Sequence, residues 1–415
     1  MRVLIINTSE RTGGAAIAAN RLMHALKKYG LRVLMLVRDK QTEQMSVKAI
    51  PQNWRLPVKF LWERLVIIFL NGFSRKRMWL VDLANTGTDV TKLSEFQSAD
   101  VVHLHWVNQG FLSLRNLEHI LQSGKRIVIT MHDMWYFTSV CHYAGTCRQY
   151  ETQCERCEQL GGGRAACKRV RRTFERKMQM YHRADITFVG CSQWMADMAS
   201  RSALARGHRV VSIPNAIDTD VFAPQDKAEA RRAFHLPADK QLLLFGAQRI
   251  TDKRKGFAYL DRAMRIIVER DPQAARKLAI VVMGGDSEQV RHALPVEVVP
   301  AGYVSNEDQM AQLYNAVDAY VTPSLQDNLP NTIVEAMACG VPCVGFRVGG
   351  IPEMIDHHQN GYVARYQDAE DFAEGILWTI SEERNRQLAE AARAKALATY
   401  SEESVAKRYV EIYEQ

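Results

Sequence analysis

Short apolar runs alternate with amphipathic helical segments along the chain, and this alternation restricts the fold more than any other feature. Residues 3–6 form an apolar run, a glycine pair follows, and a helical pattern extends over about residues 15–28 before the next apolar run at 32–37. This order of strand, helix and strand is the pattern of βαβ units, whose strands lie parallel in one sheet. The sequence therefore predicts an α/β fold.

The same alternation begins again after Pro214, so the chain contains two α/β halves. A length of 415 residues allows two or three domains. We expect an N-terminal Rossmann-like domain over residues 1–210 and a C-terminal one over residues 211–399. A terminal helix over about residues 400–415 could return to the first domain. The apolar runs of the second half lie at residues 242–245, 278–283, 319–322 and 343–346.

The chain is basic, with a formal net charge of +8 and an isoelectric point near 9.0. Nucleic acid, an anionic membrane surface or a phosphorylated substrate could each account for this charge. The sequence contains no zinc-finger array and no aromatic RNA-binding signature, which argues against nucleic acid. The first residues form a strand pattern and not a signal peptide, so we expect a cytoplasmic protein.

One segment, residues 57–77, departs from the alternation. Its apolar run at residues 65–70 is preceded by Arg64 and followed by a cluster of three cations at residues 75–77. The run is far shorter than the ~20 residues that span a bilayer. The segment is either a helix buried in the first domain or a helix in the interface of a membrane, with its cations on lipid phosphates.

Cations gather directly after a strand of the second half. Arg249 follows the strand, and Lys255 and Gly256 come shortly after it. A diphosphate binds at the carboxyl ends of strands in an open α/β sheet, where cations can neutralise it. A charge run on a solvated surface is the more common interpretation, but the place of this run after a strand favours a diphosphate site.

The loop and helix over residues 323–340 carry two carboxylates, Asp327 and Glu335, eight positions apart. The loop amides and the N-terminus of the helix can receive a phosphate group. Glu335 lies where a carboxylate can accept hydrogen bonds from a ribose. Two further glycine loops, at residues 13–14 and 349–350, also follow strands.

With these pieces in order, the chain resembles glycosyltransferase family 4, a group of retaining enzymes with the GT-B fold, in which two Rossmann-like domains face each other across a cleft. The match covers nearly the whole chain, and each piece alone is modest. The matching pieces are Gly13-Gly14-Ala15, Thr130-Met131-His132-Asp133, Ile213-Pro214-Asn215-Ala216-Ile217-Asp218, Arg249 with Lys255-Gly256, Gly302-Tyr303-Val304, Asp327 to Glu335, and Gly349-Gly350.

The resemblance implies a role for each site residue. Arg249 and Lys255 would hold the donor diphosphate, Glu335 the ribose, and Asp327 the donor sugar. His132 would face the sugar at the reacting centre, and Gly14 would lie near the donor phosphate. The remaining implied donor contacts are Tyr303 and Val304 beside the base, and Asn328, Leu329, Pro330 and Asn331 in the phosphate loop. The family usually has glutamate where this chain has Asp327, which bears on the donor sugar and not on the reaction class.

The implied reaction moves a sugar from a nucleoside-diphosphate sugar to a glycan or lipid-linked glycan with retention of configuration. Cations and helix-end amides would stabilise charge on the leaving phosphate. No cofactor or catalytic metal is expected. The expected setting is bacterial surface polysaccharide synthesis at the inner face of the plasma membrane. The alternative is a GT-B enzyme that isomerises or hydrolyses a nucleotide sugar without transferring it.

Four cysteines, Cys141, Cys147, Cys154 and Cys157, fall within an insertion at about residues 138–160. Four thiolates can form a closed tetrahedral zinc site. In a cytoplasmic protein such cysteines are more often thiols or metal ligands than disulfides, but all three interpretations stay open. The insertion resembles one in bacterial polysaccharide glycosyltransferases of the colanic-acid type.

Overall fold

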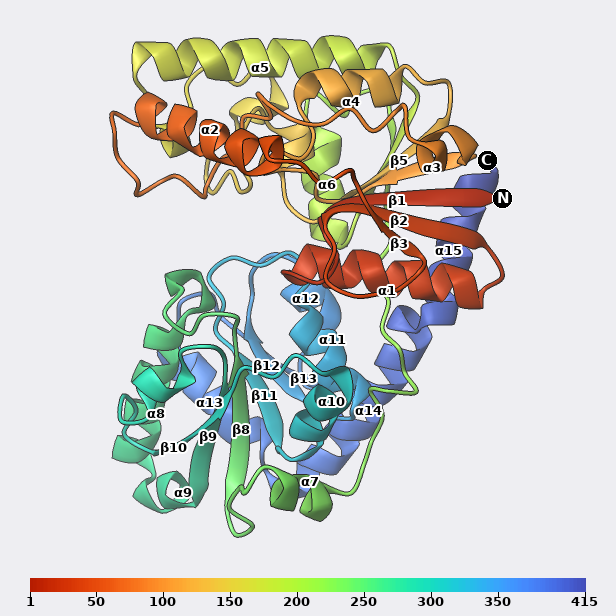
Figure 1. Ribbon diagram of the computed structural model, residues 1–415. Coiled ribbons are helices and arrows are strands. Elements are labelled where there is room, and N and C mark those ends of the chain that lie inside the picture. The colour runs from red at the N-terminus through yellow and green to blue at the C-terminus, as the bar shows by residue number, and fades with distance from the viewer. The chain divides into compact units, whose positions relative to one another are not determined.

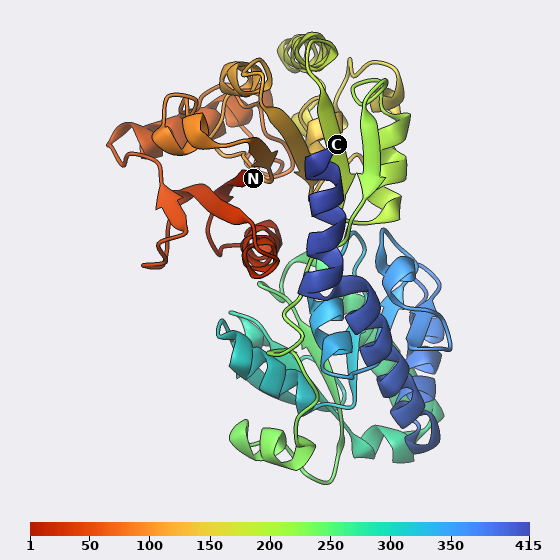
Figure 2. The same cartoon turned by 90° about the vertical axis from the view of Figure 1, so that its right-hand side faces the viewer.

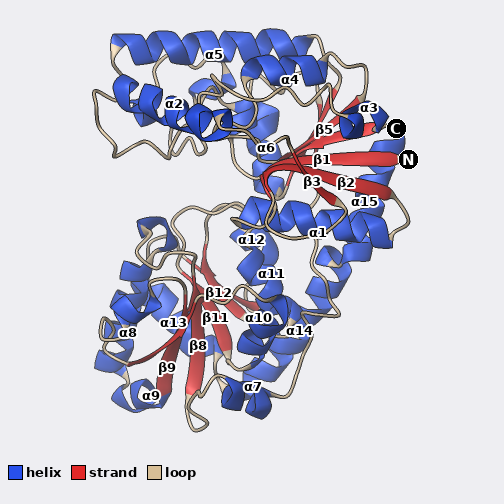
Figure 3. Cartoon of the chain, viewed as in Figure 1, coloured by secondary structure: helices blue, strands red, loops and turns tan.

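A computed structural model describes residues 1–415, and they form two compact units (Figure 1). The first unit comprises Met1–Pro214 and Val405–Gln415, and the second comprises Asn215–Ser404. Each unit is built on one sheet of parallel strands with helices against it (Figure 3). The predicted pair of Rossmann-like α/β domains is therefore confirmed.

The first unit contains a seven-stranded sheet in the order β3-β2-β1-β4-β5-β6-β7. Its strands are rich in branched apolar residues because both faces of a parallel sheet are buried. In β1, for example, all residues except the first are buried. The strands are β1 (Arg2–Ser9), β2 (Arg32–Asp39), β3 (Val47–Ala49), β4 (Val101–Leu104), β5 (Arg126–Met131), β6 (Ile186–Gly190) and β7 (Arg209–Ser212).

The helices of the first unit come mainly from the segments between these strands. The terminal helix α15 (Glu402–Glu414) also reaches this sheet: the hydroxyl groups of Tyr413 and Tyr409 lie 2.7 Å from His103 Nδ1 and 2.9 Å from Thr130 Oγ1 (Figure 2, dark blue). The other helices are α1 (Gly14–Lys28), α2 (Arg55–Leu70), α3 (Ser94–Ser98), α4 (Leu114–Leu121), α5 (Arg164–His182) and α6 (Gln193–Arg201), with short 3-10 turns η1 (Trp135–Phe137), η2 (Gln149–Glu151) and η3 (Glu158–Leu160).

The second unit contains a six-stranded sheet in the order β10-β9-β8-β11-β12-β13. Its strands are β8 (Gln241–Gly246), β9 (Leu278–Met283), β10 (Glu297–Gly302), β11 (Ala319–Thr322), β12 (Cys343–Phe346) and β13 (Gly361–Ala364). Its helices are α7 (Lys227–Ala233), α8 (Phe257–Arg270), α9 (Pro272–Lys277), α10 (Glu307–Asn315), α11 (Asn331–Ala338), α12 (Ile351–Met354), α13 (Ala369–Thr379) and α14 (Glu382–Tyr400), with 3-10 turns η4 (Lys253–Lys255) and η5 (Ser287–Val290).

Helix α2, which carries the apolar segment, is anchored to the first unit by charged side chains. Glu63 and Arg64 are 0% and 4% exposed. Arg64 Nη2 lies 3.0 Å from the carboxylate of Asp82, which is also fully buried. Glu63 Oε1 accepts hydrogen bonds from the backbone N–H groups of Leu83 and Ala84 at 3.1 and 2.8 Å. Glu63 and Arg64 of α2 therefore face the protein interior.

One of the two buried carboxyl groups holds a proton at neutral pH. Burial and the nearby Asp82 carboxylate raise the pKa of Glu63 to about 9. Burial disfavours ionisation of Asp82 as well, but Arg64 and the hydrogen bond from Glu63 outweigh it and lower the pKa of Asp82. The pair therefore shares one proton, which lies on Glu63 and is donated toward Asp82.

Replacing Glu63 with glutamine should remove a pH dependence of stability. Between about pH 4.3 and the folded pKa of about 9, the folded wild type binds a proton that the unfolded chain has released, so its stability falls as pH rises. Glu63→Gln keeps the carbonyl acceptor and a donor but does not titrate. Its free energy of unfolding relative to wild type should therefore increase with pH, by at most about 1.4 kcal/mol per unit.

Urea denaturation at several pH values measures this difference. Glu155→Gln, at an exposed glutamate of the same unit, is the control and should follow the wild type. A constant difference between Glu63→Gln and wild type from about pH 6 to about pH 8 would show that the carboxyl group is ionised in the folded protein.

Candidate functional site

Each sheet has a point where the strand connections reverse direction, and ligands of open α/β sheets bind at the carboxyl ends of strands beside that point. In the first unit the reversal lies between β1 and β4, and in the second between β8 and β11. The segments that follow β1, β8 and β11 hold most of the predicted donor-site residues, while His132 follows β5, and Tyr303 and Val304 follow β10. The two units are described in turn, starting with the second.

The loop from β8 to α8 presents an unpaired cation. The Arg249 side chain is exposed and makes no hydrogen bond or ion pair. The loop around it is held in place, because the Asp286 carboxylate accepts the backbone N–H groups of Ile250 and Thr251 at 2.7 and 3.3 Å. Arg254, in the same loop, pairs with Asp252 at 2.7 Å. Arg249 therefore stands on a fixed loop, open to an anionic ligand.

Lys255 and Asp327, which were both predicted in the donor site, form an ion pair. Lys255 Nζ lies 2.7 Å from Asp327 Oδ2, and both side chains are partly exposed. The other oxygen, Asp327 Oδ1, accepts the backbone N–H of Asn328 at 3.1 Å. The pair joins the β8–α8 loop to the β11–α11 loop and leaves ammonium hydrogens of Lys255 able to reach a phosphate oxygen.

Two glycines allow neighbouring backbones to approach the β11–α11 loop. A Cβ atom on Gly256 would lie 1.8 Å from the carbonyl oxygen of Pro323, and one on Gly349 would lie 1.7 Å from the carbonyl oxygen of Asp327. Both glycines also have positive φ, 74° and 57°. Any side chain at either position would push the loop away. The loop therefore lies between two backbone segments that fix its shape.

The β11–α11 loop ends at a helix start suited to an anion. The N-cap residue of α11 is Pro330, which gives no side-chain cap, and the first turn contains no acidic residue. Asn331 Oδ1 accepts a hydrogen bond from Asn215 Nδ2 at 2.9 Å. Asn328 and Leu329 are buried, 4% and 7% exposed. Their backbones, and not their side chains, are thus the groups that can meet a ligand.

Glu335 is placed one turn into α11, and its side chain is buried. It is 1% exposed, and Tyr314 Oη donates a hydrogen bond of 2.8 Å to Glu335 Oε2. Tyr314 itself lies on α10 and is fully buried. A ribose would therefore meet a carboxylate that Tyr314 has already oriented. At the end of β10, Tyr303 is 65% exposed and Val304 is half-buried, so an aromatic ring is available to a base.

In the first unit, α1 begins at Gly14, directly after the β1 loop. Its N-cap residue, Gly13, has φ of 90° and no side chain to cap the helix, and the first turn carries no acidic group. A Cβ at Gly13 would meet nothing within 4 Å, so the glycine is required by backbone conformation and not by crowding. The start of α1 resembles that of α11 in lacking any negative side chain.

Three histidines lie together where β4 and β5 end. His105 Nδ1 lies 2.9 Å from His132 Nε2, and His132 Nδ1 lies 3.4 Å from the thiol of Cys191. Burial lowers the pKa of His132 to about 4 and that of His103 to about 3, and it also lowers the pKa of His105. All three are neutral at pH 7. Both ring nitrogens of His132 are occupied, so contact with a substrate requires it to release His105 or Cys191.

The residue after His132 organises a second network. Asp133 Oδ2 accepts hydrogen bonds from Trp106 Nε1 at 2.9 Å and from His142 Nδ1 at 2.7 Å. Burial lowers the pKa of His142, but the carboxylates of Asp133 and Asp82 outweigh burial and raise it. Asp133 therefore ties the β4 and β5 ends to the cysteine insertion.

The cysteine insertion brings two of its four thiols together. Cys141 and Cys157 share a hydrogen bond, which lowers the pKa of Cys157 to about 7 and contributes to raising that of Cys141. Cys147 and Cys154 lie in the same cluster of packed side chains. No three His, Cys, Asp or Glu side chains of the chain are grouped closely enough to hold a metal ion. In this arrangement the four cysteines do not form a closed zinc site.

Several residues of the site were not predicted from the sequence. Tyr314 orients Glu335, Asp286 fixes the Arg249 loop, and Asn215 contacts the start of α11. Asp286 could have been predicted from the sequence, since it follows the glycine pair after β9 at the same sheet edge. Tyr314 could not have been predicted, because an aromatic residue in a helix is normally a core residue.

Comparison with known proteins identifies the family and the fold of the chain. The model of Glycosyltransferase Family 4 matches residues 12–221, about half of the chain, and the model of Glycosyl transferases group 1 matches residues 239–382. The D-inositol 3-phosphate glycosyltransferase of Saccharomonospora viridis is 31% identical over 196 residues, which are 44% of this chain and 44% of that protein. The chain thus spans less than half the length of this curated relative.

Solved structures share the fold across the whole chain. Sucrose-phosphate synthase from Thermosynechococcus elongatus superposes with a TM-score of 0.69 at 19% identity, covering 100% of this chain and 98% of that one. Anabaena HepE in complex with UDP-glucose superposes with a TM-score of 0.64 at 16% identity, covering 100% and 99%. The fold is GT-B, and the chain belongs to glycosyltransferase family 4.

Proposed function

We propose that this chain transfers a sugar from a nucleoside-diphosphate sugar to a glycan or lipid-linked glycan with retention of anomeric configuration. The observation that carries the proposal is the group of diphosphate ligands at one edge of the second sheet. Arg249, Lys255 and the N-terminus of α11 follow β8 and β11, the two strands at which the connections reverse. The name of the S. viridis relative and the UDP-glucose bound to HepE agree with a sugar-nucleotide donor.

The proposed chemistry stabilises charge on the leaving nucleoside diphosphate. Arg249 and Lys255 meet the two phosphates, and the N–H groups at the start of α11 add the positive end of the helix dipole. Because these donors are fixed by Asp286, Asp327 and the glycine contacts, little reorganisation is needed when the sugar–phosphate bond breaks. Glu335 holds the ribose, and Tyr303 covers the base.

Retention follows in this proposal from attack on the same face that the diphosphate leaves. Asp327 is the carboxylate nearest the proposed phosphates, but its two oxygens are engaged by Lys255 and the Asn328 backbone, which makes it a poor nucleophile. We assign it to sugar hydroxyl groups instead. A phosphate oxygen of the leaving group then accepts the proton of the acceptor hydroxyl. His132, neutral at pH 7, contributes a hydrogen bond to the sugar and not a positive charge.

The acceptor in this proposal is a growing bacterial surface polysaccharide, handled on the cytoplasmic side of the plasma membrane. A panel of nucleoside-diphosphate sugars, assayed for released nucleoside diphosphate with and without lipid-linked glycans, tests the reaction class. Release that depends on the acceptor, together with a new glycosidic bond in the product, supports transfer. Release or rearrangement of the donor that is indifferent to every acceptor would instead indicate a hydrolase or an isomerase.

Arg249→Ala should weaken donor binding while leaving the fold unchanged, since the side chain is exposed and makes no hydrogen bond or ion pair. Losing one charged hydrogen-bonding contact is worth about 1.5–3 kcal/mol, which corresponds to roughly a 10- to 150-fold rise in the dissociation constant. Isothermal titration calorimetry with UDP and with UDP-glucose measures the dissociation constant. The matched control is Arg262→Ala, an exposed and unpaired arginine on α8. Equal affinity in wild type, Arg249→Ala and Arg262→Ala would remove Arg249 from the donor site.

A structural zinc ion remains a proposal from the cysteine spacing, although the thiols are not grouped around a common centre in the structure. If zinc binds, protein purified under reducing conditions should contain about one zinc per chain, and Cys154→Ser should lose it. Elemental analysis by mass spectrometry measures the content. Cys343→Ser, at a buried cysteine of the second unit, is the control. Zinc-free wild type with titratable thiols would leave the cysteines as reduced packing residues.

A further inference from the structure

Helix α2 packs Leu56 and Ile67 in the core but also exposes a large apolar surface and buries a charged pair. Its charged pair, Glu63 and Arg64, faces the interior, while large apolar residues face outward. Trp62 is 58% exposed and Phe69 is 59% exposed. Surface helices of water-soluble proteins normally bury the apolar face and expose the charged one. Buried polar contacts therefore hold α2 in an orientation that leaves large apolar side chains facing outward.

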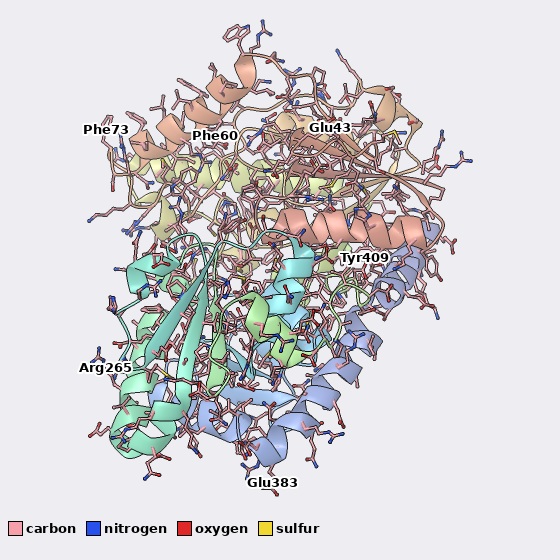
Figure 4. All side chains as sticks on the ribbon, turned by 60° about the horizontal axis from the view of Figure 1, so that its bottom comes forward. Glu43, Phe60, Phe73, Arg265, Glu383 and Tyr409 are labelled. Carbon is pink, nitrogen blue, oxygen red and sulfur yellow. The ribbon has the colours of Figure 1, made fainter.

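The exposed residues of α2 form one continuous surface, here called the α2 stripe. The spacing of the helical members is three, four, seven and eight positions, which places them on one side of a helix. Phe73, just beyond the helix end, is 76% exposed and contacts Phe69, with ring centroids 5.7 Å apart (Figure 4 labels Phe73). Members of the stripe are Trp54, Val58, Leu61, Trp62, Leu65, Phe69 and Phe73, with Trp79 and Leu80 in the loop that follows.

Positive charge outweighs negative charge around the stripe, where the exposed Glu158 lies beside Arg77. Residues 51–81 contain six cations and one acidic residue, Glu63, which is buried. Arg75 and Lys76 are exposed and make no ion pair or side-chain hydrogen bond. The end of α2 also adjoins the start of α5, since a Cβ on Gly161 would lie 3.1 Å from the Asn71 side chain. Helix α5 adds the exposed cations Arg164, Lys168 and Arg172.

We propose that the α2 stripe inserts into the interface of an anionic lipid bilayer, with the surrounding cations on lipid phosphates. Apolar side chains on one face and cations at the edge are the features of helices that lie in the plane of a membrane. Tryptophan is also the side chain that is enriched at the level of the headgroups. No helix of the chain is long and apolar enough to cross a bilayer. The helix therefore lies in the membrane surface.

Charge favours a lipid surface over a second copy of the chain as the occupant. Two copies that paired through the stripe would bring both sets of cations together with few carboxylates between them, and like charges in contact oppose association. Lipid phosphates supply the opposite sign at any position along the stripe. The inference agrees with a lipid-linked acceptor in the proposed function but rests on α2 alone, so either proposal can fail without the other.

Sedimentation of the full chain with vesicles tests the docking surface. Wild type should sediment with vesicles containing phosphatidylglycerol and much less with vesicles of phosphatidylcholine alone. Arg75→Gln with Lys76→Gln should reduce the partition coefficient on anionic vesicles by roughly thirtyfold, the change that corresponds to about 1 kcal/mol for each cation. The control, Arg115→Gln with Arg126→Gln, changes two exposed cations on other elements of the first unit and should bind as wild type.

The apolar part of the stripe is tested by Trp62→Gln with Phe69→Gln, which should lower binding by at least about tenfold. Tyr29→Gln with Met45→Gln, at exposed apolar residues elsewhere on the unit, is the control. Circular dichroism checks that each variant is folded, and UDP binding checks the donor site separately. Wild type that stays in the supernatant with every vesicle overturns the inference. So does a concentration-dependent dimer in sedimentation velocity that the stripe variant converts to monomer.

Discussion

Burial of both faces of a parallel sheet is the constraint on which the rest of this molecule depends. Strands covered on two sides by helices must be apolar throughout, as in β9, where all six residues are buried. Polar chemistry is then excluded from the strands and moves to the loops at their ends. Because the strands run parallel, the loops that follow them meet at one edge. In the second unit this edge holds Arg249, Lys255 and the start of α11.

This constraint explains why the sequence predicted the fold and the sheet edge at which the candidate donor residues of the second half lie. Arg249, Asp327 and Glu335 could be assigned because each follows a recognisable apolar run, and parallel order then brings the loops together. The contacts that orient these residues were not visible in the sequence. Tyr314 reaches Glu335 from α10, and Asp286 reaches Ile250 from the β9 loop. Both contacts join different elements that pack together in the folded chain. The distance between those elements along the sequence follows no period, so a sequence pattern cannot reveal the contacts.

The orientation of α2 could also not be predicted from the sequence, for a related reason. Its apolar residues occur on nearly every side of the helix, so periodicity does not select the buried face, and both a buried and an interfacial helix remained open. The deciding contacts come from Asp82 and the backbone of residues 83–84, outside the helix. A buried ion pair contributes little net stability, since desolvation offsets most of the attraction, but it is costly to break once formed. It therefore fixes which way the helix faces more than how stable the unit is.

Burial also determines the charge of the histidines in the first unit. Burial keeps His103, His105 and His132 neutral at pH 7, so these three histidines add no positive charge where β4 and β5 end. The cations proposed for the diphosphate all lie in the second unit, on the loops after β8. Neutral imidazoles can donate and accept hydrogen bonds but do not attract an anion, whereas Arg249 and Lys255 attract one. Burial in the first unit and exposed cations in the second unit thus give the two sheet edges different chemistry, although both edges arise from the same parallel-strand constraint.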